Sequence, residues 1–188
     1  ATDPLYVVRI WEGGMSIHGG VAGAVLGIIW FARKNDYPAW RLLDAGAITT
    51  PPGLFFGRIA NFINGELWGR PTDGSWGVVF PKAPGPDVPR HPSQLYEALL
   101  EGPVLFALLY YVLKRSKIDG VTASFFLLGY GSLRFLVEFY RAPDPFIGYE
   151  FLGMTRGQEY SLIFVLVGLI ILYLRRRWTR SELFNGLS

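Results

Sequence analysis

The sequence predicts an all-α fold, a polytopic bundle of about five transmembrane helices, and three observations lead to this prediction. Hydrophobic residues make up 51% of the 188 residues and aromatic residues 16%, with a positive mean hydropathy. Such a composition is too apolar for an ordinary soluble domain. Several apolar stretches reach the length of a membrane-spanning helix. Basic residues gather at alternate connections between these stretches, as is typical of membrane proteins.

The apolar stretches are long enough to cross a bilayer, for which about 20 residues are needed. They cover residues 14–32, 42–64, 93–113, 121–141 and 160–174. Pro51, Pro52 and Gly53 interrupt the second stretch. Because proline removes a backbone donor, we expect a kinked or broken helix there. Residues 1–188 are predicted to form a single transmembrane domain. The chain begins at Ala1 without a methionine, and we expect it to be a fragment or a processed chain.

The basic residues between the stretches set the expected orientation. They are Arg33, Lys34, Arg41, Lys114, Arg115, Lys117, Arg175, Arg176, Arg177 and Arg180. All of them fall on one side of the membrane if the stretches span it in turn, and the positive-inside rule makes that side cytoplasmic. The C-terminus is then cytoplasmic, and residues 67–91 are external. Many Gly and Pro residues, with Trp68 and Trp76, make 67–91 an external loop or cap.

Composition also limits the kinds of functional site that the chain can form. The chain has no cysteine, so it has no disulfide, no thiolate metal site and no cysteine nucleophile. We expect no metal and no cofactor. The net charge of +3 gives no sign of a nucleic-acid partner, and none is expected. The sequence also lacks an H-E-x-x-H zinc helix and a phosphate-binding glycine loop. Ser132 lacks the G-x-S-x-G context of a serine hydrolase.

Two polar clusters interrupt the apolar stretches, and both are expected near the external side. The first is Arg58, Asn61, Asn64 and Glu66, and the second is Tyr130, Arg134, Glu138 and Arg141. The spacing of the second cluster places its members on one helical face. Ionisable groups at membrane depth are costly and usually mark a substrate path. We therefore predict a polar cavity that opens toward the outer leaflet, with His18 at a similar depth.

Each of these residues also has a purely structural interpretation. Arg58 and Arg134 could reach the lipid headgroups without taking part in any chemistry. Arg141 could be an interfacial anchor or a partner of Glu138, and Glu138 could only neutralise Arg134. His18 could cap a helix, although histidine is also the side chain best suited to exchange protons near neutral pH. His91 is interpreted as structural, whereas the roles of Tyr96 and Glu97 stay open.

Converging guanidinium groups at headgroup depth form a site for a phosphate, which they can hold by bidentate hydrogen bonds. A phospholipid is the expected anionic ligand. If a bond is broken, Arg58 and Arg134 would stabilise the charge on the departing phosphate, and His18 or a carboxylate would handle a proton. The nucleophile would come from the substrate or from a group other than cysteine.

Five sequence blocks carry a resemblance to a known family. They are residues 11–20 (WEGGMSIHGG), 57–71 (GRIANFINGELWGRP), 91–97 (HPSQLYE), 134–141 (RFLVEFYR), and Gly157-Gln158 followed by Ser161. In this order they resemble bacterial phosphatidylglycerol:prolipoprotein diacylglyceryl transferase. The resemblance covers almost the whole chain. The family normally has further spans upstream of the matching part, which carry an N-terminal tyrosine of its site.

The resemblance implies a membrane enzyme of the bacterial plasma (inner) membrane. Its partners would be phosphatidylglycerol and the signal peptide of a preprolipoprotein, whose lipobox cysteine thiol would receive the diacylglyceryl group. The products would be a thioether and glycerol phosphate. His18, Arg58 and Arg134 would be catalytic, and Arg58 and Arg134 would also hold the phosphate. The residues that match the family's motif and would shape the substrate site are Asn61, Asn64, Glu66, Gly69, Glu138 and Arg141, and Tyr130 joins them by its position on the helical face.

Two other functions fit the same residues. A non-enzymatic bundle could bind or transport a phospholipid with the same arginines, although transporters often contain repeated halves, and the sequence shows no repeat. A fragment that folds without any activity is the third possibility. Incubation with labelled phosphatidylglycerol and a lipobox peptide separates these alternatives, because only the enzyme forms a thioether.

Overall fold

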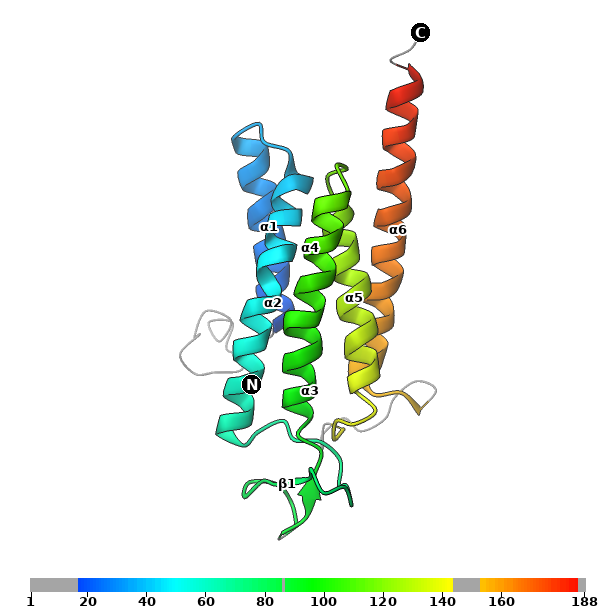
Figure 1. Ribbon diagram of the computed structural model, residues 1–188. Helices are drawn as coiled ribbons and strands as arrows, with labels where there is room; N and C mark the ends of the chain where they lie inside the picture. Colours follow the sequence, from blue (N-terminus) through cyan, green and yellow to red (C-terminus); the bar gives the residue numbers. More distant parts are fainter. Residues whose placement is uncertain (1–16, 86, 144–152, 186–188) are drawn as a thin grey trace. The chain divides into compact units, whose positions relative to one another are not determined.

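The computed structural model describes residues 17–85, 87–143 and 153–185 (Figure 1). The chain divides into two compact units, residues 1–43 and 44–188. The first unit contains helix α1 (Ile17–Lys34), which ends in Arg33 and Lys34. Basic side chains at this end interact favourably with the helix dipole. Helix α2 (Ala39–Asn64) starts in the first unit and continues in the second. The prediction of a single domain stays a prediction.

The second unit is built mainly from helices. Helices α3 (Ser93–Leu99), η3 (Leu100–Val104) and α4 (Leu105–Arg115) follow one another without a break, and α5 (Val121–Val137) and α6 (Arg156–Asn185) come after them. Figure 1 shows α4, α5 and α6 side by side. Glycines allow the close packing: a Cβ on Gly131 would lie 2.7 Å from the Ser161 carbonyl oxygen, and one on Gly168 would lie 3.0 Å from the Ser124 carbonyl oxygen. Such small residues are typical of contacts between membrane helices.

Long apolar helices support the membrane class. Within the described ranges, two helical stretches are long and apolar enough to cross a membrane, Ser93–Arg115 and Arg156–Arg177, and Val121–Val137 is a shorter apolar helix. Large apolar side chains on α6 such as Leu166, Leu169 and Leu174 are more than half exposed. An apolar helix surface of this kind is suited to lipid rather than water. The described part of the chain is therefore typical of a helical membrane protein, while the count of five spans stays a prediction.

The second apolar stretch is not broken at its two prolines, and the non-helical backbone occurs in the third stretch. Helix α2 is continuous across Pro51 and Pro52, so the expected break is absent. Instead, Gly102 in η3 has the non-helical angles φ −92° and ψ −107°, and Pro103 follows it. Without a side chain, Gly102 can adopt this conformation, and Pro103 has no N–H to place in a helix. The kink therefore lies in the third apolar stretch.

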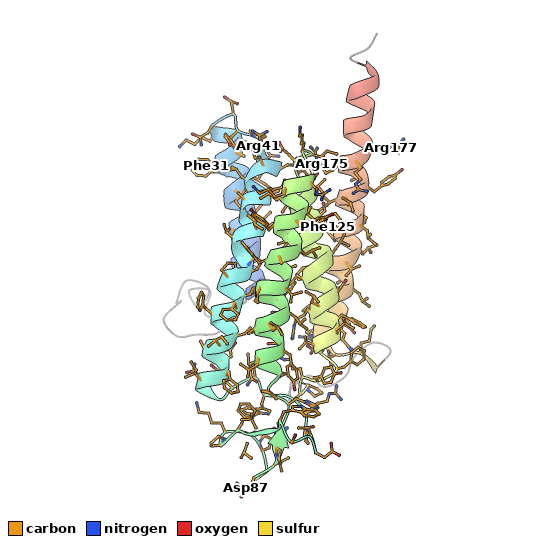
Figure 2. All side chains as sticks on the ribbon, viewed as in Figure 1. Phe31, Arg41, Asp87, Phe125, Arg175 and Arg177 are labelled. Atoms are coloured by element: carbon orange, nitrogen blue, oxygen red, sulfur yellow. The ribbon has the colours of Figure 1, made fainter. Side chains whose placement is uncertain are left out.

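One end of the second unit is tied together by polar contacts. Asp44 of α2 accepts hydrogen bonds from the backbone N–H groups of Gly120 and Ala123, each at 2.7 Å. The carboxylate therefore caps the N-terminus of α5, where backbone donors lack helical partners. Arg175 donates to the Asp119 carbonyl oxygen at 2.7 Å, so the part of α6 that carries Arg175 and Arg177 lies at this same end (Figure 2).

The opposite end carries the segment between α2 and α3, which contains two short strands. Strand β1 (Val78–Val79) pairs antiparallel with β2 (Pro89–Arg90), so the predicted loop includes a small hairpin. Two isolated bridges add to it, Gly69 with Arg141 and Pro71 with Arg90. Arg90 donates to the carbonyl oxygens of Gly69 and Pro84, at 3.3 and 2.8 Å. These contacts fix the segment against the chain that follows α5.

Candidate functional site

A buried carboxylate joins the two polar clusters. Glu97 of α3 is fully buried, and its Oε1 accepts hydrogen bonds from Nη1 of Arg134 and, at 3.0 Å, from Nη1 of Arg141. Its Oε2 forms an ion pair with Nε of Arg58 at 3.1 Å. Arg58 comes from α2, Arg134 from α5, and Arg141 from the turn after α5. A buried charge requires such partners, because desolvation costs several kcal/mol per ion.

Two further carboxylates complete the cluster. Glu138 pairs with Nη2 of Arg134 at 2.7 Å, and its Oε1 accepts a hydrogen bond from the Thr155 hydroxyl at 3.0 Å. Glu101 is fully buried, and its Oε2 accepts a hydrogen bond from Nε of Arg58 at 3.3 Å. We call these six side chains the arginine–glutamate cluster: Arg58, Arg134, Arg141, Glu97, Glu101 and Glu138. Three positive and three negative groups balance when all are ionised.

Arg58 and Arg134 differ in the donors that they leave without a partner among the described residues. Arg134 uses both terminal nitrogens, one for Glu97 and one for Glu138. Arg58 uses only Nε, and its Nη1 and Nη2 have no partner among the residues that the structure describes. The Arg58 side chain is also 16% exposed. Arg58 therefore offers the pair of terminal donors that a phosphate can accept in bidentate fashion.

A second group of predicted residues gathers at the end of α2. Asn64 and Asn61 donate side-chain hydrogen bonds to Oε1 of Glu66, at 3.0 and 3.4 Å. These hydrogen bonds, the one from Asn64 first, lower the pKa of the Glu66 carboxyl below its ordinary value of 4.5. Asn61 lies one helical turn beyond Arg58, so the two groups are neighbours along α2. Lys82 donates to the Asn64 carbonyl oxygen at 2.8 Å and links the hairpin segment to this end.

Gly69 allows two backbone segments to pack closely next to Arg141. A Cβ at this position would lie 2.4 Å from the His91 carbonyl oxygen and 2.6 Å from that of Tyr140, so a side chain does not fit. Gly69 donates its N–H to His91 and pairs with Arg141 in a β-bridge. Arg70 then donates its Nε to the Arg141 carbonyl oxygen at 3.0 Å. Gly69 thus contributes to the site by fixing the chain that carries Arg141.

Tyr130 and His18 complete the predicted set. Tyr130 lies one turn from Arg134 in α5, with its ring stacked on Phe126 and tilted against Phe164. His18 lies in the first turn of α1, in the first unit. Its side chain is outside the described part of the structure, so its place in a shared cavity with Arg58 and Arg134 stays a prediction.

Sequence reasoning left open the residue at the centre of the cluster and missed a second one. From the sequence the role of Glu97 stays open, and Glu101 is not among the predicted site residues. Their spacing carried a signal, because carboxylates at i and i+4 in an apolar stretch share one helical face and both need a partner. Within the described residues, no group of three or more His, Cys, Asp or Glu side chains is arranged to hold a metal ion.

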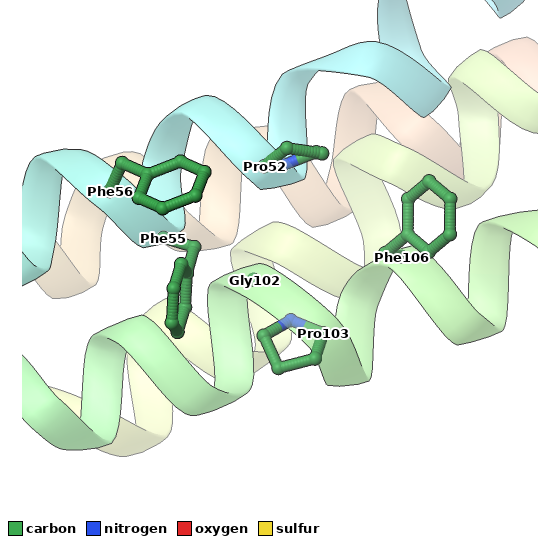
Figure 3. Close-up of a pocket in the computed structure, with 6 residues that line it drawn as sticks. All are labelled: Pro52, Phe55, Phe56, Gly102, Pro103 and Phe106. Carbon is green, nitrogen blue, oxygen red and sulfur yellow. The ribbon is translucent and has the colours of Figure 1, made fainter.

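An apolar pocket of about 240 Å³ lies beside the cluster. Figure 3 shows its lining from α2 and from the kinked helix: Pro52, Phe55, Phe56, Gly102, Pro103 and Phe106. Phe55 is one turn before Arg58, and Gly102 follows Glu101 directly. Apolar surface therefore adjoins the charged groups, an arrangement that suits an amphipathic ligand.

The fold and the cluster define a class: a helical membrane protein with a buried arginine–glutamate centre at one end, suited to an anionic substrate. The sequence identifies the family within that class. Residues 1–174 match the model of the prolipoprotein diacylglyceryl transferase family, and the chain belongs to this family, as the resemblance of its sequence blocks predicted.

Relatives of this family are about half identical to the chain. A protein of Allorhizobium ampelinum is 49% identical over 190 residues, which cover 99% of this chain and 66% of the relative. A protein of Bordetella avium is 50% identical over 176 residues, 94% of this chain and 66% of the relative. A protein of Teredinibacter turnerae is 50% identical over 172 residues, 91% of this chain and 59% of the relative. All three are named phosphatidylglycerol–prolipoprotein diacylglyceryl transferase. The chain thus spans less than two thirds of their length.

Proposed function

We propose that this chain carries the phosphate-binding part of an enzyme that transfers the diacylglyceryl group of phosphatidylglycerol to a preprolipoprotein. The acceptor is the thiol of the lipobox cysteine, and the products are a thioether and glycerol phosphate. Family membership and the names of the relatives support this proposal. The observation that carries it is the pair of Nη groups on Arg58 that have no partner among the described residues, at the edge of a charge-balanced cluster.

The reaction requires attack at carbon. A thioether forms when the thiolate sulfur attacks the carbon of the diacylglyceryl group that is bonded to the phosphate oxygen. The carbon–oxygen bond then breaks, and its electron pair leaves with the phosphate oxygen. Arg58 holds the phosphate and stabilises the growing charge, while Arg134 and Arg141 keep Glu97 neutralised beside it. Glu138 in turn fixes Arg134, and Gly69 fixes Arg141.

A base must take the thiol proton, because a thiol with a pKa of about 8.5 is mostly protonated near neutral pH. His18 is the proposed base, with a carboxylate of the cluster as the alternative. A positioned base contributes about 10²- to 10⁴-fold. We expect His18→Gln to lose turnover by this factor without a matching change in the KM for phosphatidylglycerol. Turnover close to that of the unmodified enzyme would assign His18 a structural role.

The remaining polar residues are proposed to surround the substrate. Asn61, Asn64 and Glu66 form a hydrogen-bonded group one turn beyond Arg58, where the glycerol headgroup of the lipid carries hydroxyl groups. Amides and a carboxylate can bind such hydroxyls. Tyr130 lies one turn before Arg134 in α5, whereas Glu138 lies one turn after it. Tyr130 is therefore proposed to line the deeper part of the cavity.

We propose that the protein spans the bacterial inner membrane several times, with five spans in this chain and a cytoplasmic C-terminus. The end of the second unit where Arg175 donates to the Asp119 carbonyl oxygen also carries the basic last turn of α4, with Lys114 and Arg115. The arginine–glutamate cluster lies toward the other end, beside the hairpin segment. By the positive-inside rule, the cluster then faces the external leaflet.

The test uses the full-length membrane protein in detergent or vesicles. It is incubated with labelled phosphatidylglycerol and a lipobox peptide, and the peptide is analysed for a thioether-linked diacylglyceryl group. A peptide with serine in place of cysteine is the control. Lipid binding without any thioether would favour a non-enzymatic lipid-binding bundle and would refute the proposed function.

A further inference from the structure

The kink in the third apolar stretch coincides with the charged cluster. Helix η3 contains Glu101, the non-helical Gly102 and Pro103 in succession. A sharp turn of this kind within a helix has an identifiable cause, which here is Gly102 followed by Pro103. Here the turn carries a fully buried carboxylate, although apolar residues occupy most of the stretch.

Gly102 allows α2 to approach this kink. A Cβ on Gly102 would lie 2.8 Å from Cβ of Phe55, which is closer than two carbon atoms can pack. Phe55 is one turn before Arg58 in α2, and Figure 3 shows it facing the kinked helix. The close contact between α2 and η3 therefore brings the Arg58 side chain to the level of Glu101.

The hydrogen bond of Nε assigns a direction to the Arg58 guanidinium. Nε carries one hydrogen, and Glu101 accepts it at 3.3 Å, whereas Glu97 lies nearer, at 3.1 Å, but makes only an ion pair. Because a guanidinium is planar, fixing the Nε–H bond also fixes the directions of Nη1 and Nη2. Those are the two nitrogens that have no partner among the described residues.

The free energy that is needed to bury the Glu101 carboxylate argues against a role in stability alone. Its Oε1 has no hydrogen-bond partner within the described part of the chain. A buried carboxylate with one unsatisfied oxygen is unfavourable, and replacing buried ion pairs with apolar residues is often neutral or stabilising. The hydrogen bond that Glu101 accepts from Arg58 instead indicates a role in orienting the guanidinium group.

We infer that Glu101 is a positioning residue, which orients Arg58 so that its two terminal nitrogens face the phosphate of the lipid. This inference rests on the proposed function. It goes beyond it by assigning the orientation of the phosphate-binding group to a carboxylate that does not itself contact the substrate.

The test is a double-mutant cycle in the full-length enzyme, with thioether formation as the measurement. Glu101→Met keeps the volume and removes the acceptor, and a misplacement of about 1 Å can cost about 10²-fold in turnover. We expect a loss of that size in kcat. Glu101→Gln retains an oxygen that accepts from Nε, and should recover most of it. In the Arg58→Lys background, Glu101→Met should change kcat by less than about 3-fold, because the group that it orients is gone.

Glu101→Asp provides a second measurement should the methionine variant fail to fold. It retains the charge but shortens the side chain, so that the contact already at 3.3 Å is lost, and kcat should fall. The matched control is Asp44→Asn, another buried carboxylate, which should have the same effect in the unmodified enzyme and in the Arg58→Lys background. Equal effects of Glu101→Met in both backgrounds, or full activity of Glu101→Asp, would overturn the inference. Absence of thioether from the unmodified enzyme would instead refute the proposed function.

Discussion

Replacing Glu97 by glutamine tests the centre of the cluster. The substitution keeps the shape of the side chain and removes the charge that faces Arg58, Arg134 and Arg141. Arg58 and Arg134 each retain a second carboxylate, Glu101 and Glu138. Arg141 has no other carboxylate partner among the described residues. The cluster therefore changes from balanced to one uncompensated positive charge, on the Arg141 side chain, which is 18% exposed.

That single unpaired charge sets the expected magnitude. Removing one partner of a buried ion pair costs about 3–5 kcal/mol. The losses at the three arginines do not add, because they share the same carboxylate. We expect the free energy of unfolding to fall by about 3–5 kcal/mol, a large part of the 5–15 kcal/mol typical of folded proteins.

Denaturant titration of the purified protein in detergent measures this change, from the shift of the midpoint at constant slope. Asp73→Asn is the matched control, since it removes the charge of an exposed carboxylate outside the cluster. It should shift the midpoint little. A change below about 1 kcal/mol for Glu97→Gln would show that the arginines do not depend on Glu97, and the description of the cluster would have to be abandoned.

The other predictions concern Arg58, Gly69 and Glu66. Arg58→Lys retains the charge but loses the paired donors, so turnover should fall by about 10²- to 10³-fold. The control, Arg177→Lys on the exposed surface of α6, should have no effect on turnover. Comparable turnover of the two variants would exclude bidentate binding. Gly69→Ala should destabilise the fold by about 1–3 kcal/mol in the same titration, because a Cβ at this position has no room. At Gly53 a Cβ would meet nothing within 4 Å, so Gly53→Ala should leave the midpoint unchanged. Equal midpoints for the two variants would contradict the close packing around Gly69. The lowered pKa of Glu66 means that its hydrogen bonds stabilise the folded state above its ordinary pKa of 4.5 and that this contribution is lost as pH falls through the lower folded pKa. The thermal midpoints of the unmodified protein and Glu66→Gln should accordingly converge in acid, and a difference that stayed constant with pH would refute this.

The sequence by itself was enough to predict the class of the protein and to locate the polar residues within its apolar stretches. Span length and hydropathy are local properties, because a bilayer selects apolar stretches of about 20 residues wherever they occur. Helix α5 covers most of the stretch predicted from residue 121, and α6 includes all of the one predicted from residue 160. The placement of Arg134 and Glu138 one turn apart follows from helical spacing alone, and their ion pair is present.

The tertiary structure decided which charges meet. Glu97 and Arg134 are 37 positions apart, and Arg58 and Glu101 are 43, so no local rule connects them. Sequence spacing likewise did not show that the backbone bends at Gly102 while α2 continues through Pro51 and Pro52. The Arg58–Glu101 pair depends on the contact between α2 and η3, and the Glu97–Arg134 pair on the contact between α3 and α5, because a buried charge is stable only where another helix supplies its partner. Partner and depth are fixed by packing, which the order of residues along one helix does not specify.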